Sequence, residues 1–400
     1  MVQRLANYQK GNARTAGSFW SRRLLSLYLT TWLLLCAAAT LHAEDEWLWL
    51  DAKINGRNAR LVFDTGTSHL VLFPDGATRL GLNFTNAPPD AKVAPGDVPA
   101  GVTEECEFSV GETTVRTRLR IVDMPAVLRV KFDGFIGWGA LSDNIIEIDA
   151  RLGAVYALSN TTGIPTTWTQ FALQTNSDTL VLEATLKNGS AQTFLVDTGS
   201  SDGVALSPAD WRRWKSAQKK QRLTLRSYYT PNLGLVVAEE GWARRLSIGP
   251  LVLTDVPITE AKRPTAAPQY TAILGLAAIK RLDFIVDGKR GVAYLHPTRA
   301  PLKNYMHNRL GAAFVPIDIQ SDDLIAHVAG GSPAEKAGIR SGDILLQIGT
   351  LDVTKWRSDP TVLPLSRFWE QSPGTKLDIT LRRGTERLKV KARLRQILPP

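Results

Sequence analysis

Two aspartates open the same short phrase at distant points of the chain. One phrase is Asp64-Thr65-Gly66-Thr67-Ser68 and the other is Asp197-Thr198-Gly199-Ser200-Ser201, and each follows an apolar stretch. Two carboxyl groups about 3 Å apart cannot both ionise, so they share one proton and their pKa values separate. Such a pair can take a proton from a water and give one to a carbonyl oxygen, which needs neither a metal nor a covalent intermediate.

The residues that follow each aspartate are expected to support this pair. The threonine beside each aspartate can lock one loop to the other, and the glycine lets the backbone turn tightly. The hydroxyl three positions after each aspartate can donate a hydrogen bond to a carboxylate. A pair of aspartate turns at strand ends is the alternative, but repetition in register favours the chemistry. The residues in these supporting roles are Thr65, Gly66, Thr67, Thr198, Gly199 and Ser200.

Both phrases belong to a longer internal repeat. Asn55-Gly56 and Asn188-Gly189 precede the aspartates by equal distances, and Asn-Gly between apolar runs predicts a β-hairpin. An apolar-apolar-glycine motif recurs downstream as Phe135-Ile136-Gly137 and Ile273-Leu274-Gly275. The repeat predicts two homologous β-rich lobes, at 44–160 and 177–300, with a linker at 161–176. A helix is expected at 207–221, opening at Ser207-Pro208.

These paired motifs resemble the pepsin and retropepsin aspartic peptidases over about residues 45–298. The resemblance implies a mainly β fold, two β lobes forming a cleft for an extended peptide, and Asp64 and Asp197 as the catalytic pair. The sequence differs from pepsin-like enzymes at the first-lobe flap, because no tyrosine lies between Asp64 and Phe135. The candidate flap is 93–110. Tyr228 and Tyr229, in the matching part of the second lobe, are expected to be ordinary surface or core residues, with cover of the cleft as the alternative.

The C-terminal part carries a second resemblance. Gly331-Ser332-Pro333-Ala334, with Ala337-Gly338-Ile339 and Gly342-Asp343-Ile344 after it, closely resembles the bacterial PDZ pattern over about 305–397. This implies a small α+β barrel-like domain. Leu310-Gly311-Ala312-Ala313-Phe314 falls where PDZ domains place the loop that holds a peptide's C-terminal carboxylate, ahead of an edge strand that pairs with the peptide. A plain strand is the alternative there.

The N-terminus predicts a targeting segment. Arg22-Arg23 precede an apolar run, and Leu41-His42-Ala43 offers a cleavage point before Glu44, so residues 1–43 are expected to be a signal peptide. The run is short for a membrane span, and a retained anchor is the alternative. The mature protein is expected in the periplasm or cell envelope of a bacterium. Cleavage would leave Cys106 as the remaining cysteine, which excludes an intrachain disulfide.

The charge distribution limits the classes of partner. The net charge is +10, yet basic and acidic residues are equal in number between 44 and 300. A neutral body with basic ends argues against a nucleic-acid enzyme. The cysteine and histidines show no metal-ligand spacing, so neither a metal nor a cofactor is expected. The expected partners are peptide or protein substrates and a C-terminal peptide ligand of the PDZ domain. Membrane contact is expected only through an uncleaved leader.

Together these observations predict an exported aspartic endopeptidase whose PDZ domain recruits or positions substrates. The alternative is a non-catalytic peptide-binding or envelope scaffold protein that uses the cleft and the PDZ domain. The two aspartates with their hydroxyl neighbours favour the enzyme, because a binding protein has no need of two like charges in contact.

Overall fold

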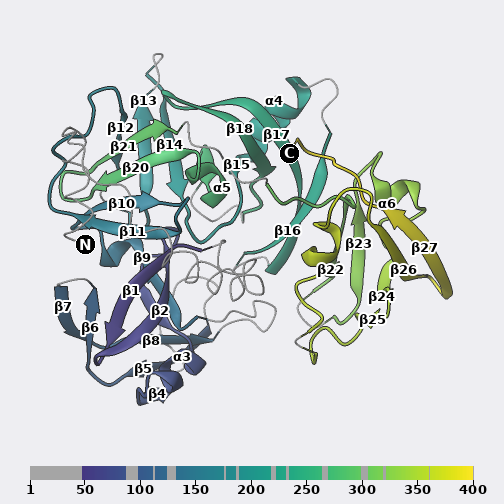
Figure 1. The fold of residues 1–400 in the computed structure, drawn as a ribbon, viewed down its shortest axis with the longest axis horizontal. Coiled ribbons are helices and arrows are strands. Elements are labelled where there is room, and N and C mark those ends of the chain that lie inside the picture. Colours follow the sequence, from purple (N-terminus) through teal and green to yellow (C-terminus); the bar gives the residue numbers. More distant parts are fainter. Residues whose placement is uncertain are drawn as a thin grey trace, which may run out of the picture. The chain divides into compact units, whose positions relative to one another are not determined.

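The fold is mainly β, as predicted (Figure 1). The computed structural model describes residues 47–86, 98–110, 113–123, 132–174, 177–185, 189–217, 222–230, 234–263, 269–298, 305–318, 321–359 and 361–399. Over these ranges, no helix has the length and apolar character needed to cross a membrane.

The first lobe begins with the predicted hairpin. β1 (Trp49–Ile54) and β2 (Arg57–Asp64) are antiparallel, and Asn55 and Gly56 between them have φ values of 49° and 76°. Positive φ at both positions is what a two-residue Asn-Gly turn requires. The other elements are β3 (Leu70–Leu72), α3 (Pro74–Arg79), β4 (Phe84–Asn86), β5 (Val98–Thr103), β6 (Cys106–Val110), β7 (Thr113–Thr117), β8 (Arg120–Asp123), β9 (Gly134–Gly137), the 3-10 helix η1 (Trp138–Ala140), β10 (Ile145–Asp149) and β11 (Ala154–Leu158).

The second lobe repeats this plan. β13 (Val181–Thr185) and β14 (Ala191–Val196) form the matching hairpin. The predicted helix begins where expected, because the Ser207 hydroxyl accepts a hydrogen bond from the Asp210 amide at 3.2 Å and caps α4 (Pro208–Ala217). The other elements are β12 (Thr169–Leu173), β15 (Val204–Leu206), β16 (Thr224–Thr230), β17 (Gly234–Ile248), β18 (Leu251–Glu260), β19 (Ala272–Leu274), α5 (Leu276–Ile279), β20 (Leu282–Asp287) and β21 (Val292–Pro297).

The segment 161–176, expected as a linker, contains strand β12. This strand pairs antiparallel with both β13 and β21. Phe171 and Leu173 on it are buried, while the residues beside them are exposed. Such alternation is typical of a strand with one face on a core, so this part of the segment belongs to the sheet of the second lobe.

The sheet is continuous between the two lobes. β10 of the first lobe pairs antiparallel with β20 of the second, with Ile146 opposite Val286, and Figure 1 shows these strands side by side with β11 and β21. Arg151 forms an ion pair with Asp283 across the same boundary at 2.7 Å. β10 and β20 hold equivalent places in the repeat, so the two lobes meet through like elements.

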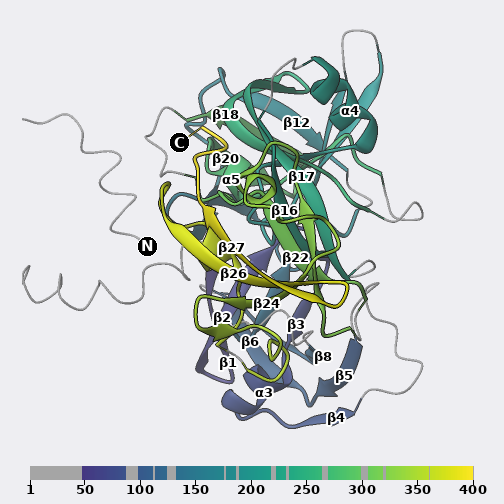
Figure 2. The ribbon, with the colours of Figure 1, turned by 90° about the vertical axis from the view of Figure 1, so that its right-hand side faces the viewer.

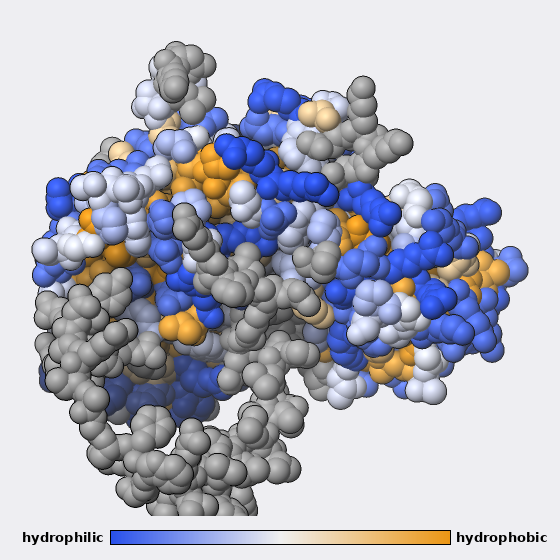
Figure 3. Space-filling model, turned by 45° about the horizontal axis from the view of Figure 1, so that its top comes forward, coloured by the Kyte–Doolittle hydropathy of each residue, from blue (hydrophilic) through white to orange (hydrophobic). Residues whose placement is uncertain are grey.

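The C-terminal domain has a separate sheet and its own core. The strands run in the order β22-β23-β24-β26-β27, and β25 pairs with β24. Ser332 caps a short helix by accepting from the Glu335 amide at 3.2 Å, and Gly338 follows that helix with φ 88°. Figure 3 shows a mainly hydrophilic surface on this domain, with small apolar areas. The elements are β22 (Ala312–Pro316), β23 (Leu324–Val328), α6 (Pro333–Lys336), β24 (Ile344–Ile348), β25 (Leu351–Asp352), α7 (Ser366–Trp369), β26 (Lys376–Arg383) and β27 (Glu386–Arg393).

Candidate active site

Buried strands deliver the two aspartates to one place. β2 ends at Asp64 and runs parallel to β9, with Asp64 opposite Gly137. β14 ends one residue before Asp197 and runs parallel to β19, with Val196 opposite Leu274. Each aspartate therefore lies beside the apolar-apolar-glycine strand of its own lobe.

Four hydrogen bonds join the two loops. The Thr65 amide donates to Oγ1 of Thr198 at 3.0 Å, and the Thr198 amide donates to Oγ1 of Thr65 at 3.1 Å. The Thr65 hydroxyl donates to the Val196 carbonyl and the Thr198 hydroxyl to the Phe63 carbonyl, each at 2.6 Å. Both threonines are fully buried. The expected lock between the loops is present, and it fixes the position of each aspartate relative to the other.

The two glycines let each loop pass close to the opposite aspartate. A methyl group on Gly66 would lie 2.8 Å from Cγ of Asp197, and one on Gly199 would lie 2.5 Å from Cγ of Asp64. Carbon atoms do not approach so closely without displacement, so each position requires glycine. The carboxyl groups of Asp64 and Asp197 lie close enough for each to affect the pKa of the other.

Backbone amides are the donors to the carboxylates. The Gly66 amide donates to Oδ1 of Asp64 at 2.9 Å, and the Gly199 amide donates to Oδ1 of Asp197 at 3.1 Å. An aspartate accepting from the amide two residues later is a common turn. The same donors recur in both lobes, as the repeat implies.

Hydrogen bonds from the Thr67 and Ser200 hydroxyls to the carboxylates stay a prediction. The Ser200 hydroxyl accepts from the Asp202 amide at 3.3 Å. The amides of Thr67 and Ser200 donate to the backbone carbonyls of Asp64 and Asp197 at 3.3 and 3.2 Å. These contacts close the turn that follows each aspartate.

Burial raises the pKa of both aspartates. Loss of water raises the pKa of Asp64 to about 6, against the lowering effect of the amides of Gly66, Gly199 and Thr67. Loss of water, then the nearby charge of Asp64 and that of Asp202, raise the pKa of Asp197 to about 8. Two carboxyl groups in contact hold one proton between them over this interval. The pair can therefore act as a base and an acid at once.

The five residues expected to bind a peptide in the C-terminal domain are buried. Leu310 and Gly311 precede β22, which holds Ala312, Ala313 and Phe314, and none of the five is exposed. Strands β16 and β17 of the second lobe lie against β22 (Figures 1 and 2). A ligand role for these residues stays a prediction, because their strand is covered in this structure.

The amides of that loop already have an acceptor. Oδ1 of Asn308 accepts from the amides of Leu310 and Gly311 at 3.0 and 2.9 Å. A bound peptide carboxylate would accept from amides of this kind. In this structure the Asn308 side chain takes that place, so both amides are already hydrogen-bonded.

Other predicted segments fall partly outside the described residues. The leader 1–43 and residues 93–97 of the candidate flap lie there, while the rest of the flap segment contributes β5 and β6 to the first-lobe sheet. The Tyr228 hydroxyl accepts from the Lys262 amide at 2.9 Å and so connects β16 to the segment just after β18.

Among the residues that the structure covers, no group of three or more histidine, cysteine or acidic side chains could hold a metal ion.

The sequence did not predict a buried polar network behind the Asp197 loop. Arg226 lies among Ser201, Asp202, Glu240 and Tyr305. The local sequence feature that points to this network is the polar run Ser200-Ser201-Asp202, which directly follows Asp197-Thr198-Gly199. A buried aspartate needs a cation, but nothing in the spacing points to Arg226.

Comparison with known proteins supports the two-lobed arrangement. A family model described as aspartyl protease matches residues 50–140 and 182–278. The two matched segments contain Asp64 and Asp197, respectively, and correspond to the two copies of the repeat. No match was found among curated proteins. The match supports a protease-like function for a chain built from two β lobes.

Proposed function

We propose that this chain is an exported aspartic endopeptidase in which Asp64 and Asp197 activate a water for attack on a peptide bond. The observation that carries this proposal is the threonine lock, because it joins the two loops directly beside Asp64 and Asp197 and so fixes the two aspartates relative to each other. The family match supports the same class of reaction.

The geometry suggests a simple sequence of proton transfers. The ionised carboxylate takes a proton from the water as its oxygen bonds to the peptide carbon, and the protonated carboxyl gives its proton to the carbonyl oxygen. The resulting tetrahedral diol then breaks its C–N bond, with one hydroxyl proton returning to a carboxylate and the amine leaving with a proton from the other. The pair ends with one proton, ready for another cycle.

A peptide-library digest of the mature protein tests the dyad. Asp64→Asn and Asp197→Asn should each lower the cleavage rate by at least about 100-fold while leaving the fold intact, since acid–base groups contribute 10²–10⁴-fold. Asp143→Asn, an exposed position in the first lobe, is the control and should keep the wild-type rate. Wild-type activity in either dyad variant would refute the assignment. Peptide binding without cleavage at any pH would favour the non-catalytic binding protein.

Export is a separate part of the proposal. Protein recovered from a cell envelope fraction should begin near Glu44, since the apolar run and the small Ala43 fit a cleaved signal. N-terminal sequencing measures this directly. Membrane-bound protein that keeps residues 1–43 would establish the anchor instead.

We also propose that the C-terminal domain is of the PDZ type and positions substrates near the cleft. The capped helix α6, the Gly338 that follows it and the β26–β27 hairpin support the PDZ assignment. The burial of Ala312, Ala313 and Phe314 favours positioning within the intact chain over free recruitment of peptides.

A further inference from the structure

The loop that follows Asp197 is held on one side by backbone hydrogen bonds common to both lobes. In the second lobe the Leu276 amide donates to the Ser200 carbonyl at 2.8 Å, and in the first lobe the Trp138 amide donates to the Thr67 carbonyl at 3.0 Å. The Ala277 amide adds a bond to the Asp202 carbonyl at 2.9 Å. This support belongs to the repeat itself.

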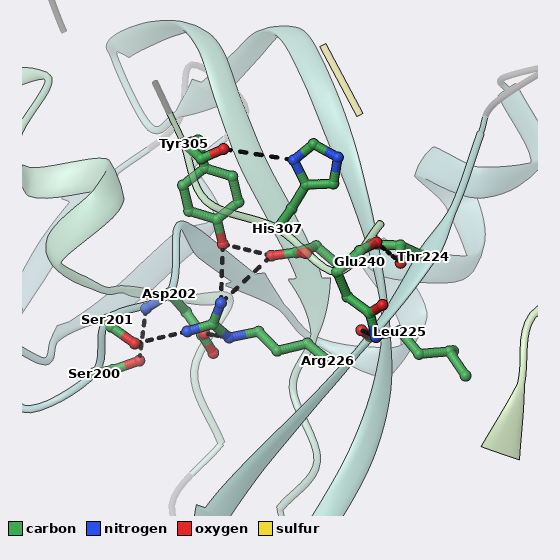
Figure 4. Close-up of polar contacts among 10 residues, drawn as sticks. Ser200, Ser201, Asp202, Thr224, Leu225, Arg226, Glu240, Tyr305 and His307 are labelled. Atoms are coloured by element: carbon green, nitrogen blue, oxygen red, sulfur yellow. Dashed lines mark hydrogen bonds and ion pairs between the residues drawn. The ribbon is translucent and has the colours of Figure 1, made fainter. Parts of the chain in front are cut away.

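The other side of the Asp197 loop is held by the side chain of Arg226, which lies on β16. Its Nη2 donates to the Ser201 hydroxyl at 2.6 Å, and its Nε forms an ion pair with Oδ1 of Asp202 (Figure 4). The Arg226 side chain is 20% exposed and that of Asp202 is 10% exposed. A largely buried, paired arginine with fixed partners holds a loop far better than an exposed ion pair does.

Tyr305 holds the far end of the same guanidinium. Nη1 of Arg226 donates to the Tyr305 hydroxyl at 3.1 Å, and that hydroxyl donates to Oε1 of Glu240 at 2.5 Å (Figure 4). Glu240 lies on β17, and its side chain is 1% exposed. Arg226 therefore has a partner on each side: the catalytic loop and the segment that leads into the C-terminal domain.

That segment also binds β16 directly at the two residues that precede Arg226. The Thr224 hydroxyl donates to the Asn308 carbonyl at 2.6 Å, and Nδ2 of Asn308 donates to the Leu225 carbonyl at 3.0 Å. The same Nδ2 donates to the Ala312 carbonyl at 2.8 Å, at the first residue of β22. The start of the C-terminal domain and the strand that carries Arg226 are thus one hydrogen-bonded unit.

The network is electrically linked to the dyad. The charge of Asp202 raises the pKa of Asp197, and Arg226 offsets that charge. Burial raises the pKa of Glu240 to about 7, against the lowering effect of Arg226. Removing the Arg226 cation would leave the charge of Asp202 uncompensated beside the dyad. The described ionisable groups that face the dyad and the network are Asp64, Asp197, Asp202, Arg226, Tyr228, Glu240, Arg263, Arg281, Tyr305 and Glu370.

We propose that Arg226 is a positioning residue for the Asp197 loop and that the C-terminal domain, through Tyr305 and Asn308, holds Arg226 in place. Docking of the C-terminal domain is then part of the catalytic arrangement, even for substrates too short to reach that domain. This inference rests on the proposed peptidase function.

Kinetics on one short fluorogenic peptide, cleaved by the full mature chain, test the proposal. Arg226→Met should lower kcat about 10- to 100-fold with little change in KM, the range expected when a catalytic group shifts by about 1 Å. It should also move the alkaline limb of the pH–rate profile to higher pH, because the uncompensated charge of Asp202 would raise the pKa of Asp197 further. Arg226→Lys keeps the charge and should restore the pH limb while recovering only part of kcat. Arg382→Met, which removes an exposed ion pair in the C-terminal domain, is the matched control and should behave as wild type.

Tyr305→Phe tests the link to the C-terminal domain with a minimal change. It keeps the ring and removes one hydroxyl, so kcat should fall about fivefold, the equivalent of one hydrogen bond. Tyr156→Phe in the first lobe is its control. If Arg226→Met fails to fold, Tyr305→Phe alone decides the matter.

Two results would overturn the inference. One is wild-type kcat and an unmoved pH limb in Arg226→Met or, if that variant does not fold, wild-type kcat in Tyr305→Phe. The other is an equal loss in Arg226→Met and Arg226→Lys at an unchanged pH profile, which would indicate packing alone. In either case, inactive Asp64→Asn and Asp197→Asn variants would show that the dyad assignment stands and that this inference alone fails.

Discussion

Gly66 and Gly199 let the two aspartates approach each other because neither glycine has a side chain. A side chain at either position would meet the carboxyl group of the opposite lobe. The positions of the two carboxyl groups therefore depend on glycine at both sites as much as on the aspartates. A substitution at either glycine would displace a carboxyl group without changing any charge.

Gly199→Ala should abolish activity, because its Cβ would lie 2.5 Å from Cγ of Asp64 and would force the carboxyls apart. The expected loss in kcat is at least about 100-fold, as for other displacements of about 1 Å in a catalytic site. Gly330→Ala, where a Cβ meets nothing within 4 Å, should be neutral. Steady-state kinetics with circular dichroism would measure both; a Gly199→Ala enzyme of normal kcat would contradict the close contact.

The raised pKa of Asp197 also predicts a pH-dependent stability. A carboxyl whose folded pKa is raised to about 8 binds its proton more tightly in the folded state than in the unfolded chain, so stability falls as pH rises from about 4 to about 8. Asp197→Asn removes this titration. The variant should be more stable than wild type by about 2 kcal/mol above pH 8, after discounting for the coupling of the pair, with little difference near pH 4. Urea unfolding at both pH values measures this, and a constant difference would contradict the raised pKa.

At the scale of elements, β22 shows how a strand that looks open in sequence becomes covered. Ala312 is fully buried, and Phe314 packs against Trp369 with ring centroids 5.8 Å apart. The outer side of the strand meets the β16–β17 hairpin of the second lobe. The strand thus serves as an internal joint in this structure.

Gly311→Glu should destabilise the protein rather than block a ligand selectively. Gly311 has φ 71°, and a Cβ there would lie 2.5 Å from Cβ of Ser332. We expect a loss of at least about 2 kcal/mol in the free energy of unfolding, from backbone strain and a core clash together. Gly330→Glu is the control at an open site. Equal denaturation midpoints for the two variants would show that the loop is looser than described.

The sequence predicted those elements whose signals are local. The Asn55-Gly56 turn and the helix that opens at Ser207-Pro208 both depend on a few adjacent residues, and each is present. The meeting of Asp64 with Asp197 could be predicted because the repeat relates the two by symmetry. The Arg226 network could not, because its partners lie on separate elements and their contact depends on how the C-terminal domain docks. The sequence likewise predicts a loop and a strand at Leu310–Phe314, but it does not predict that β16 and β17 will cover them.

At the scale of the whole molecule, the two cores are joined by polar contacts. Residues 305–308 connect the second lobe to the C-terminal domain and bind β16 at Thr224, Leu225 and Arg226. The His307 ring accepts from the amides of Ile397 and Leu398 at 3.4 and 3.3 Å, so the end of the chain returns to the same junction. The junction is therefore built from both ends of the C-terminal domain.

A chain ending at Thr298 tests whether that domain only delivers substrates. It keeps both lobes but lacks Tyr305 and Asn308, so Arg226 would lose part of its support. We expect at least a tenfold loss of kcat on a short peptide, on the order of the cost of a displaced catalytic loop. A pure recruitment role predicts unchanged kcat on short peptides and a raised KM on long ones. Parallel assays on one short peptide and one folded protein separate the two.

The pairing of β10 with β20 has a consequence for a chain that has been cut. The connection between the lobes is exposed at Asn160 and Thr162, and a protease added in trace amounts could reach it. The two pieces would still share the β10–β20 ladder, the Arg151–Asp283 ion pair and the threonine lock. The nicked protein should therefore migrate as one particle in size-exclusion chromatography, separate into two bands only in denaturant, and keep its dyad assembled. Two halves made as separate polypeptides would complement one another for the same reason.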